Sequence, residues 1–254
     1  MKLTDGIALV TGAGGGLGRE LARALAARGM RVAALGRSLP GLEETAAGHD
    51  RVFPLLGDVT DAEAMRAAVT RIEGEAPLTL LINNAATYPR RDILDETGES
   101  FAETVAVNLG GTVNATRAAL DPMVARGFGR ILNVATFADV APLAGASAYS
   151  VSKGAQRIFT RALVADLADR FPDIVIGDWM PGMLATRMGI PDGLPPEKAA
   201  QWGAELALWH DPALTGTVFE MDREIPPPRS LKGRLKDRLT GQRAVLRRLG
   251  SGGG

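Results

Sequence analysis

Short apolar segments alternate with helical patterns along most of this chain, and no other feature constrains the fold as strongly. Seven segments rich in Val, Ile and Leu are bounded by turn residues, at positions 7–11, 32–35, 52–56, 78–82, 131–135, 174–179 and 218–221. Strands that are separated by helices pair in parallel, because the helix carries the chain back to the starting edge of the sheet. The alternation therefore predicts an α/β fold: a doubly wound, seven-stranded parallel sheet with helices on both faces.

The length and the composition suit one large domain. The chain has 254 residues, of which 46% are hydrophobic, enough for an ample buried core. The only shift in composition comes at residues 225–228, Ile-Pro-Pro-Pro, after which basic residues dominate. We therefore expect a single domain over residues 1–224 and a basic C-terminal extension over residues 225–254.

Three helix ends have local signals. Thr60 and Glu63 have the spacing of a capping box at a helix start. Gly29 is suited to end a helix, and Pro195-Pro196-Glu197 is suited to begin one. These signals place helices between the predicted strands.

Charge and composition exclude several classes of function. Lys plus Arg equals Asp plus Glu at 29 each, so no overall field favours nucleic acid or an anionic membrane. Cysteine is absent, and the only histidines, His49 and His210, lie far apart in loop-like stretches, so neither a metal site nor a Ser-His-Asp triad is expected. No apolar run approaches the ~18 residues that span a bilayer, and the first strand begins almost at Met1, which leaves no room for a signal peptide. We expect a cytoplasmic protein.

A glycine-rich turn, Thr-Gly-Ala-Gly-Gly-Gly-Leu-Gly, joins the first strand to the first helix at residues 11–18. Glycines let the backbone approach a pyrophosphate, and the amides at a helix start attract its charge. Glycine-rich junctions also occur for steric reasons alone, but the position within a βαβ unit favours a Rossmann-type dinucleotide site. The expected binding residues here are Gly12, Gly14, Gly15, Gly16, Leu17 and Gly18.

The end of the second strand favours NADP(H) over NAD(H). An NAD site is expected to place an acid there for the ribose hydroxyls, but Gly36 has no side chain and Arg37 offers a fork for a 2′-phosphate. The alternative is that Arg37 is a solvated loop arginine. Further expected cofactor contacts follow the third and fourth strands, at Asp58, Val59, Asn84 and Ala85.

Tyr149 and Lys153 lie four residues apart, so on a helix they share one face. A nearby ammonium favours the phenolate and would lower the tyrosine pKa from near ~10 toward working pH, although desolvation opposes this. Taken alone the pair is weak evidence, because Tyr-x-x-x-Lys also occurs by chance as a packed ring beside a solvated amine. With the glycine-rich turn and Asn83-Asn84-Ala85-Ala86 it predicts proton transfer beside a dinucleotide.

Together these motifs resemble the single-domain members of the short-chain dehydrogenase/reductase family, from Ile7 to Met221. The resemblance implies that Tyr149 is the general acid in reduction and the base in oxidation, and that Lys153 binds the nicotinamide ribose and lowers the pKa of the tyrosine. It also implies that Asn108 holds a water molecule in a proton relay, although that amide can instead cap or kink a helix. The family segment that holds the nicotinamide amide corresponds to Pro181, Gly182, Leu184 and Thr186.

The chain departs from the family pattern in three places. The catalytic serine position holds Thr136, which keeps a hydroxyl donor but adds a methyl group and a stiffer side chain. The stretch 187–194 is short for a substrate lid, which predicts an open cleft. Residues 222–224 are Asp-Arg-Glu in place of Asp-Gly-Gly, and a basic tail follows with apolar residues on one helical stripe: Leu231, Leu235, Leu239, Val245, Leu246 and Leu249. That tail is interpreted as an extension docked on a neighbouring subunit or frayed, with a lid or a dock for an acyl carrier protein as the alternative.

We predict an NADP(H)-dependent oxidoreductase acting on a ketone or secondary alcohol, with Tyr149 as proton donor and Thr136 holding the forming alkoxide. A hydrophobic, polyketide-like or cyclic substrate fits the apolar residues expected to face it: Phe137, Val140, Pro142, Leu143, Met183 and Met188. The alternatives are a 3-oxoacyl-carrier-protein reductase and a non-redox cyclase, dehydratase or epimerase on the same scaffold. A homodimer or homotetramer through the helices of Asn108 and Tyr149 is implied by the resemblance.

Overall fold

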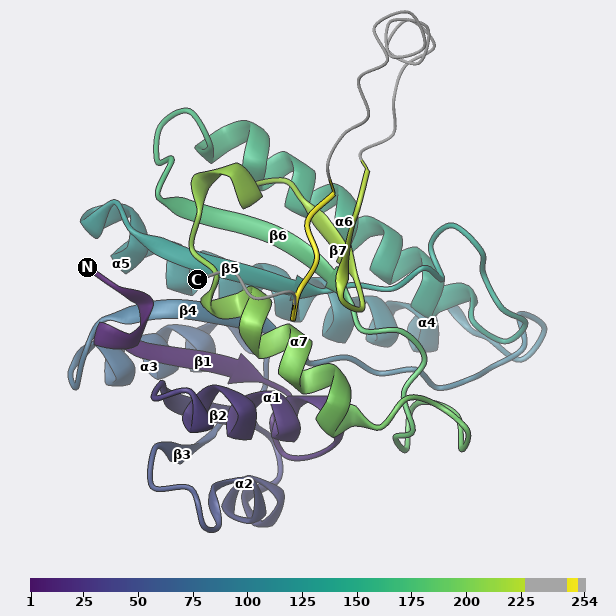
Figure 1. Ribbon diagram of the computed structural model, residues 1–254. Helices are drawn as coiled ribbons and strands as arrows, with labels where there is room; N and C mark the ends of the chain where they lie inside the picture. The colour runs from purple at the N-terminus through teal and green to yellow at the C-terminus, as the bar shows by residue number, and fades with distance from the viewer. Residues whose placement is uncertain (227–245, 251–254) are drawn as a thin grey trace, which may run out of the picture.

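The structure is a computed structural model that describes residues 1–226 and 246–250. One sheet runs through the molecule in the order β3-β2-β1-β4-β5-β6-β7-β8 (Figure 1). The strands are β1 Ile7–Thr11, β2 Arg31–Gly36, β3 Val52–Leu56, β4 Leu78–Asn83, β5 Gly129–Val134, β6 Ile174–Met180, β7 Val218–Glu220 and β8 Arg223–Ile225. The predicted doubly wound α/β fold is confirmed, with one strand more than predicted.

The additional strand, β8, pairs antiparallel with β7, whereas the other seven strands are mutually parallel. Its residues are Arg223, Glu224 and Ile225, too few and too polar to give an apolar run. A tight turn joins the two strands, with Met221 at a φ of 48°. The sheet therefore ends in a hairpin rather than in a parallel edge strand.

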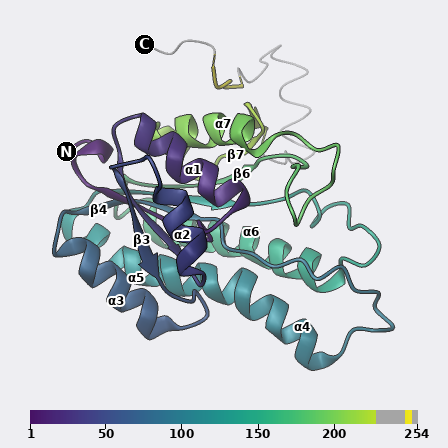
Figure 2. The ribbon, with the colours of Figure 1, turned by 90° about the horizontal axis from the view of Figure 1, so that it is seen from below.

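Helices cover both faces of the sheet (Figure 2). The main helices are α1 Gly16–Ala27, α2 Leu39–Ala46, α3 Ala62–Glu73, α4 Gly98–Val105, α5 Gly111–Arg126, α6 Ser147–Leu167 and α7 Pro196–Leu208. One apolar cluster lies between the sheet and the pair α1 and α7, and a second lies between the sheet and α3, α5 and α6. All five residues of β1 are buried, because a central parallel strand is covered on both sides.

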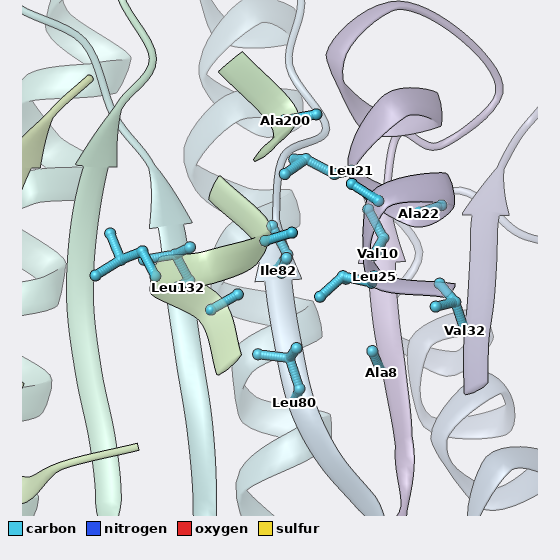
Figure 3. Close-up of a cluster of buried hydrophobic side chains, with 14 of the residues drawn as sticks. Ala8, Val10, Leu21, Ala22, Leu25, Val32, Leu80, Ile82, Leu132 and Ala200 are labelled. Atoms are coloured by element: carbon cyan, nitrogen blue, oxygen red, sulfur yellow. The ribbon is translucent and has the colours of Figure 1, made fainter. Parts of the chain in front are cut away.

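The cluster under α1 shows why the sequence folds in this way. Leu21 and Leu25, four residues apart on α1, face strand residues Val10 and Ile82, and Ala200 approaches from α7 (Figure 3). Each fully buried Leu or Ile side chain contributes about 1.5–3 kcal/mol relative to exposure. The two helices are thereby fixed to the first and fourth strands, beside which the glycine-rich turn lies.

Two predicted helix ends are confirmed and one is wrong. Helix α7 begins at Pro196, and Gly29, at a φ of 88°, follows the end of α1. The predicted capping box at Thr60 is not formed, because α3 begins one residue later and Asp61 caps it by accepting hydrogen bonds from the amides of residues 63 and 64. The hydroxyl of Thr60 donates instead to Asp58 at 2.9 Å.

The segment 246–250, from the predicted C-terminal extension, packs against the same domain beside β8 (Figure 1). Arg248 forms an antiparallel bridge with Arg223, and the Leu249 amide donates to the Asp222 carbonyl at 2.8 Å. The Leu249 side chain is buried in the cluster that contains α1 and α7. The other residues of the predicted apolar stripe, 231 to 245, lie outside the described residues. Within the described parts of the chain, no helix has the length and apolar character needed to cross a bilayer.

Candidate active site

The predicted site residues gather where the carboxyl ends of β1 and β4 meet. Strand order reverses between these two neighbours, since the chain runs outward from β1 to β3 and then returns to β4 on the other side. Such a reversal opens a crevice for ligands in doubly wound sheets. Here the Asn84 side chain donates to the Thr11 carbonyl at 2.9 Å, and the Thr11 hydroxyl accepts from the Asn84 and Ala85 amides.

The glycine-rich turn forms a cradle of closely spaced backbone, in which a side chain at Gly12 or Gly18 would clash with neighbouring backbone atoms. A Cβ at Gly12 would lie 2.8 Å from Cα of Ala85, and a Cβ at Gly18 would lie 2.3 Å from the Gly12 carbonyl oxygen. Gly15 precedes α1, and no side chain caps that helix start. The first-turn amides of α1 therefore face an open approach, and a pyrophosphate fits there. Gly14, Gly16 and Leu17 complete the same turn.

A pocket beside this turn brings together five of the residues predicted to bind the cofactor: Gly12, Arg37, Asp58, Val59 and Ala85. Its other lining residues, none of which was among the predicted cofactor contacts, are Leu35, Gly36, Gly57, Ala86 and Val107. The pairing of β2 with β3 brings Gly57 into place, because its amide donates to the Gly36 carbonyl at 3.0 Å.

Arg37 extends over the rim of this pocket and is largely exposed. Its guanidinium lies 3.7 Å from the Asp58 carboxylate. Burial raises the pKa of Asp58, but hydrogen bonds from Thr60 and the charge of Arg37 outweigh it and hold that pKa below its ordinary value. The Asp58 carboxyl group is therefore ionised at neutral pH. An exposed guanidinium beside Gly36, which has no side chain, suits a ribose that carries a phosphate.

Tyr149 is the third residue of α6, and it faces Thr136, which follows β5. The Thr136 hydroxyl lies beside the phenol. Burial raises the pKa of Tyr149, the Thr136 hydroxyl lowers it, and the neighbouring phenol of Tyr88 raises it. The net direction is upward, so the expected lowering of this pKa is wrong for this structure. At neutral pH Tyr149 holds its proton.

Lys153 explains the difference. It lies one turn after Tyr149 on α6, as predicted, but its ammonium group is buried and donates to the Val134 carbonyl at 2.9 Å and to the Gln156 side chain at 2.8 Å. Burial lowers the pKa of Lys153 to about 8, against the opposing charge of Asp178. The sequence spacing predicted the shared helix face correctly, but it gave no sign that Gln156 competes for the ammonium.

A row of buried polar side chains lies behind Lys153 and was not predicted. Register pairs Asn83 with Asn133 and Asn133 with Asp178 across β4, β5 and β6. Asn83 donates to Asn133 at 2.8 Å, Asn133 donates to the Thr160 hydroxyl at 2.9 Å, and Thr160 donates to Asp178 at 2.7 Å. Burial raises the pKa of Asp178 to about 6, although Thr160 and nearby basic groups oppose the shift.

Asn108 lies in a single π-helical turn, Ala106–Gly110, between α4 and α5. Its amide pairs with both backbone groups of Thr87: the Thr87 amide donates to it at 2.7 Å, and it donates to the Thr87 carbonyl at 3.0 Å. It also donates to the Ser152 hydroxyl at 2.9 Å. The side chain thus ties the segment after Asn84 and Ala85 to the helix of Tyr149.

The predicted nicotinamide segment follows β6 and reaches back to the glycine-rich turn. Pro181 follows the strand, Gly182 has a φ of 88°, and Leu184 bridges to Leu194. The Thr186 side chain lies 3.6 Å from the position that a Cβ would take at Gly16. These residues therefore lie on the same side of the sheet as the cradle, where a dinucleotide extended from the turn would end.

Several of the residues predicted to face the substrate are exposed apolar groups: Val140, Leu143, Met183 and Met188. The side chains of Ile93 and Leu94 are exposed as well, the latter at 92%, and were not predicted. Phe137 is half-buried and Pro142 is exposed. The chain thus exposes apolar surface on the loops after β4, β5 and β6.

Comparisons with known proteins agree with this arrangement. The family model for short chain dehydrogenases matches residues 6–193. Galactitol 2-dehydrogenase (L-tagatose-forming) of Cereibacter sphaeroides is 37% identical over 205 residues, which cover 79% of this chain and 80% of that protein. The granaticin polyketide synthase putative ketoacyl reductase 2 of Streptomyces violaceoruber is 33% identical over 185 residues, which cover 71% and 73% of the two chains. A crystal structure of a variant of actinorhodin polyketide ketoreductase with NADPH has a TM-score of 0.79 at 27% identity, and the match covers 87% of this chain and 97% of that one.

Proposed function

This chain belongs to the short chain dehydrogenase family and is an oxidoreductase acting on CH–OH or C=O groups, and we propose that it is an NADP(H)-dependent ketoreductase for a hydrophobic substrate. The observation that carries the proposal is that the Thr136 hydroxyl lies beside a protonated Tyr149, close enough to lower the pKa of its phenol. Two hydroxyl groups thereby meet at the carboxyl edge of the sheet, beside exposed apolar side chains. That pair suits a carbonyl oxygen that must receive a proton.

The proposed chemistry uses the raised pKa of Tyr149. A bound reduced nicotinamide would supply the hydride to the carbonyl carbon. Tyr149 donates its proton to the carbonyl oxygen as negative charge develops there, and the Thr136 hydroxyl donates a hydrogen bond to the same oxygen. Lys153 lies one turn away on α6, and its ammonium, bonded to the Val134 carbonyl and to Gln156 in this structure, would have to turn from these partners to stabilise the tyrosinate that remains.

The preference for NADP(H) is supported by Arg37 and Gly36 at the end of β2 and by the NADPH in the structurally similar ketoreductase. The residues proposed to hold the dinucleotide are those of the turn 12–18, the pocket residues Arg37, Asp58 and Val59, the pair Asn84 and Ala85, and the segment from Pro181 to Thr186. Glycines at the turn leave room for the pyrophosphate, and the segment after β6 lies where the nicotinamide would end.

A hydrophobic substrate is supported by the exposed apolar loops around the two hydroxyl groups and by the names of the two polyketide ketoreductases. The galactitol dehydrogenase acts on a polar polyol by its name, whereas the exposed apolar side chains of this chain favour a less polar substrate. No charged side chain is needed to bind the carbonyl itself. We propose a cyclic or polyketide-like ketone as the substrate class.

The test is NADPH oxidation, followed at its absorbance band, on a panel of hydrophobic ketones and 3-oxoacyl thioesters. Tyr149→Phe should abolish turnover and leave NADPH binding nearly unchanged, because it removes the donated proton and keeps the ring. Turnover confined to thioesters would favour a 3-oxoacyl-carrier-protein reductase. Product formed without NADPH consumption would replace the redox proposal with a cyclase, dehydratase or epimerase.

The cofactor preference has its own test in Arg37→Ala. Losing a charged hydrogen bond to a 2′-phosphate should weaken NADPH binding by about 1.5 to 3 kcal/mol and barely change NADH binding. Calorimetric titration with each dinucleotide measures both. Arg66→Ala, on the outer surface of α3 where Arg66 pairs with Glu63, is the matched control. An NADPH preference that survives the loss of Arg37 would refute its assigned role.

A further inference from the structure

The only two tyrosines of the chain, Tyr88 and Tyr149, stack on each other. Their ring centroids lie 4.6 Å apart, and the ring planes are inclined by 26°. Aromatic rings at this separation are in contact, so no group of a substrate fits between them. Tyr88 therefore covers one face of the phenol that is proposed to donate the proton.

The backbone next to Tyr88 is anchored by the buried side chain of Asn108. The preceding residue, Thr87, has both its backbone amide and its carbonyl bonded to the buried Asn108 side chain. Asn108 also donates to Ser152, whose hydroxyl donates to the Tyr149 carbonyl at 2.7 Å. A single amide thus fixes the backbone beside both rings, which sets their separation.

The outer face of Tyr88 is covered by Arg90. The guanidinium carbon lies 5.5 Å from the centre of the Tyr88 ring, within the range of a cation–π contact. The same guanidinium donates to the carbonyls of Met188 and Gly189, on the loop that follows β6. Arg90 has a φ of 47°, which residues other than glycine rarely adopt.

The segment next to Arg90 is anchored to the start of α6. The Arg91 amide donates to the Gly145 carbonyl at 3.0 Å, and Arg91 forms a bridge with Ala146, three residues before Tyr149. The Arg91 side chain pairs with Glu96 at 2.7 Å. Tyr88 is thus built into the site from three directions: by Asn108, by the start of α6 and by the loop of Met188.

We infer that Tyr88 is a specificity-determining residue, because its ring limits the width of the site around the carbonyl group. Arg90 holds this ring against the loop that contains Met188. The inference rests on the proposed ketoreductase function. A substrate with a wide planar group beside its carbonyl must displace the Tyr88 ring, and that movement breaks the contact with Arg90. The ring itself is the barrier, since the restraint comes from stacking rather than from the Tyr88 hydroxyl.

The experiment compares two ketones that differ by one fused ring, cyclohexanone and α-tetralone, in the wild type, Tyr88→Ala, Tyr88→Phe and Arg90→Met. Tyr88→Ala should raise the ratio of kcat/KM for α-tetralone over cyclohexanone by about tenfold or more, the scale on which pocket shape discriminates. Tyr88→Phe keeps the ring and should leave the ratio unchanged. Arg90→Met should shift the ratio in the same direction as Tyr88→Ala, but less.

Arg170→Met is the matched control, because Arg170 makes the same kind of contact with Phe171, at 5.2 Å, beyond the far end of α6. It should leave the ratio unchanged. Thermal unfolding of each variant establishes that it is folded. A ratio that stays at the wild-type value in Tyr88→Ala, or that moves equally in Tyr88→Phe, would overturn the inference.

A second readout does not depend on turnover. Tetranitromethane nitrates exposed tyrosine rings, and with only two tyrosines the product peptides are unambiguous by mass spectrometry. Tyr149 should be nitrated several-fold faster in Tyr88→Ala than in Tyr88→Phe at the same pH, because one ring face is uncovered. Equal rates would refute the covering contact. If the wild type reduces neither ketone, the proposed function fails for this pair, while the nitration result still decides whether Tyr88 shields Tyr149.

Discussion

At the scale of single residues, the burial of the Asp178 carboxyl group lowers the free energy of unfolding by an amount that can be measured. It lies in β6 between Gly177 and Trp179, in a segment that is otherwise apolar, and its carboxyl group is almost entirely removed from water. Burial raises its pKa to about 6 from an ordinary value of 3.8. Between these two pH values the folded protein binds more protons than the unfolded chain, so the free energy of unfolding falls as the pH rises.

Asp178→Asn should remove that dependence. The wild type should lose on the order of 2 to 3 kcal/mol between about pH 4 and pH 6 from this group, and the variant should lose none of it. The asparagine oxygen can still accept the Thr160 hydrogen bond, so packing is kept. Urea unfolding at a series of pH values measures the difference between the two proteins.

Asp121→Asn is the control, because Asp121 is exposed on α5 and pairs with Arg117. Parallel stability curves for Asp178→Asn and the wild type across this pH window would show that Asp178 is not protonated in the folded protein. The lowered pKa of Lys153 lies near 8, outside the window, and does not interfere with the comparison.

The sequence predicted those features of the candidate site that depend on local spacing, and it missed those that depend on contacts between distant elements. The four-residue spacing of Tyr149 and Lys153 placed both on one helix face, because that spacing is local geometry. The direction of the lysine ammonium depends on Gln156 and on the Val134 carbonyl from another element, which no spacing records. Tyr88 lies sixty-one positions before its stacking partner, and only the fold brings the two rings together.

At the scale of elements, the returning segment 246–250 behaves as part of the fold. The sequence placed Leu246 and Leu249 on one stripe of a helix, but the structure gives the two side chains different environments. Leu249 is 3% exposed, whereas Leu246 is 44% exposed. The Gly250 amide donates to Glu205 of α7 at 2.8 Å, which places the segment against that helix.

Leu249→Ala should therefore destabilise the protein by about 2 to 5 kcal/mol, the range for removing a buried leucine side chain. Leu246→Ala should have a much smaller effect, because its side chain is already in contact with water. Chemical unfolding followed by tryptophan fluorescence measures both variants. Equal and small losses would mean that the segment does not contribute to the core.

The start of α3 shows why the presence of a helix is easier to predict from the sequence than its first and last residues. Thr60 and Asp61 are both good capping residues, and Thr60 has the better spacing to Glu63. In the structure Asp58 takes the Thr60 hydroxyl, which leaves Asp61 to cap α3. The hydrogen bond from Thr60 to Asp58, rather than a difference in capping propensity, therefore determines that Asp61 and not Thr60 caps the helix.

At the scale of the whole molecule, the alternation of apolar runs and helices was sufficient to predict the architecture. Seven strands coincide with the predicted runs, and the four central ones, β1, β4, β5 and β6, are buried along their whole length, which favours apolar residues. The eighth strand is stabilised by pairing with β7 and by the segment around Arg248, so its own three residues need not be apolar. Long-range pairing of this kind is visible only after the chain has folded.

The position of Leu249 also bears on how the protein is made. A chain leaves the ribosome from its N-terminus onward, and β1, α1 and α7 are complete long before residue 249 is added. The apolar cluster between the sheet and these helices nevertheless includes Leu249. Until that residue emerges, the nascent protein exposes a patch beside α7 that it later covers, and this patch is a surface that a chaperone attending synthesis could bind.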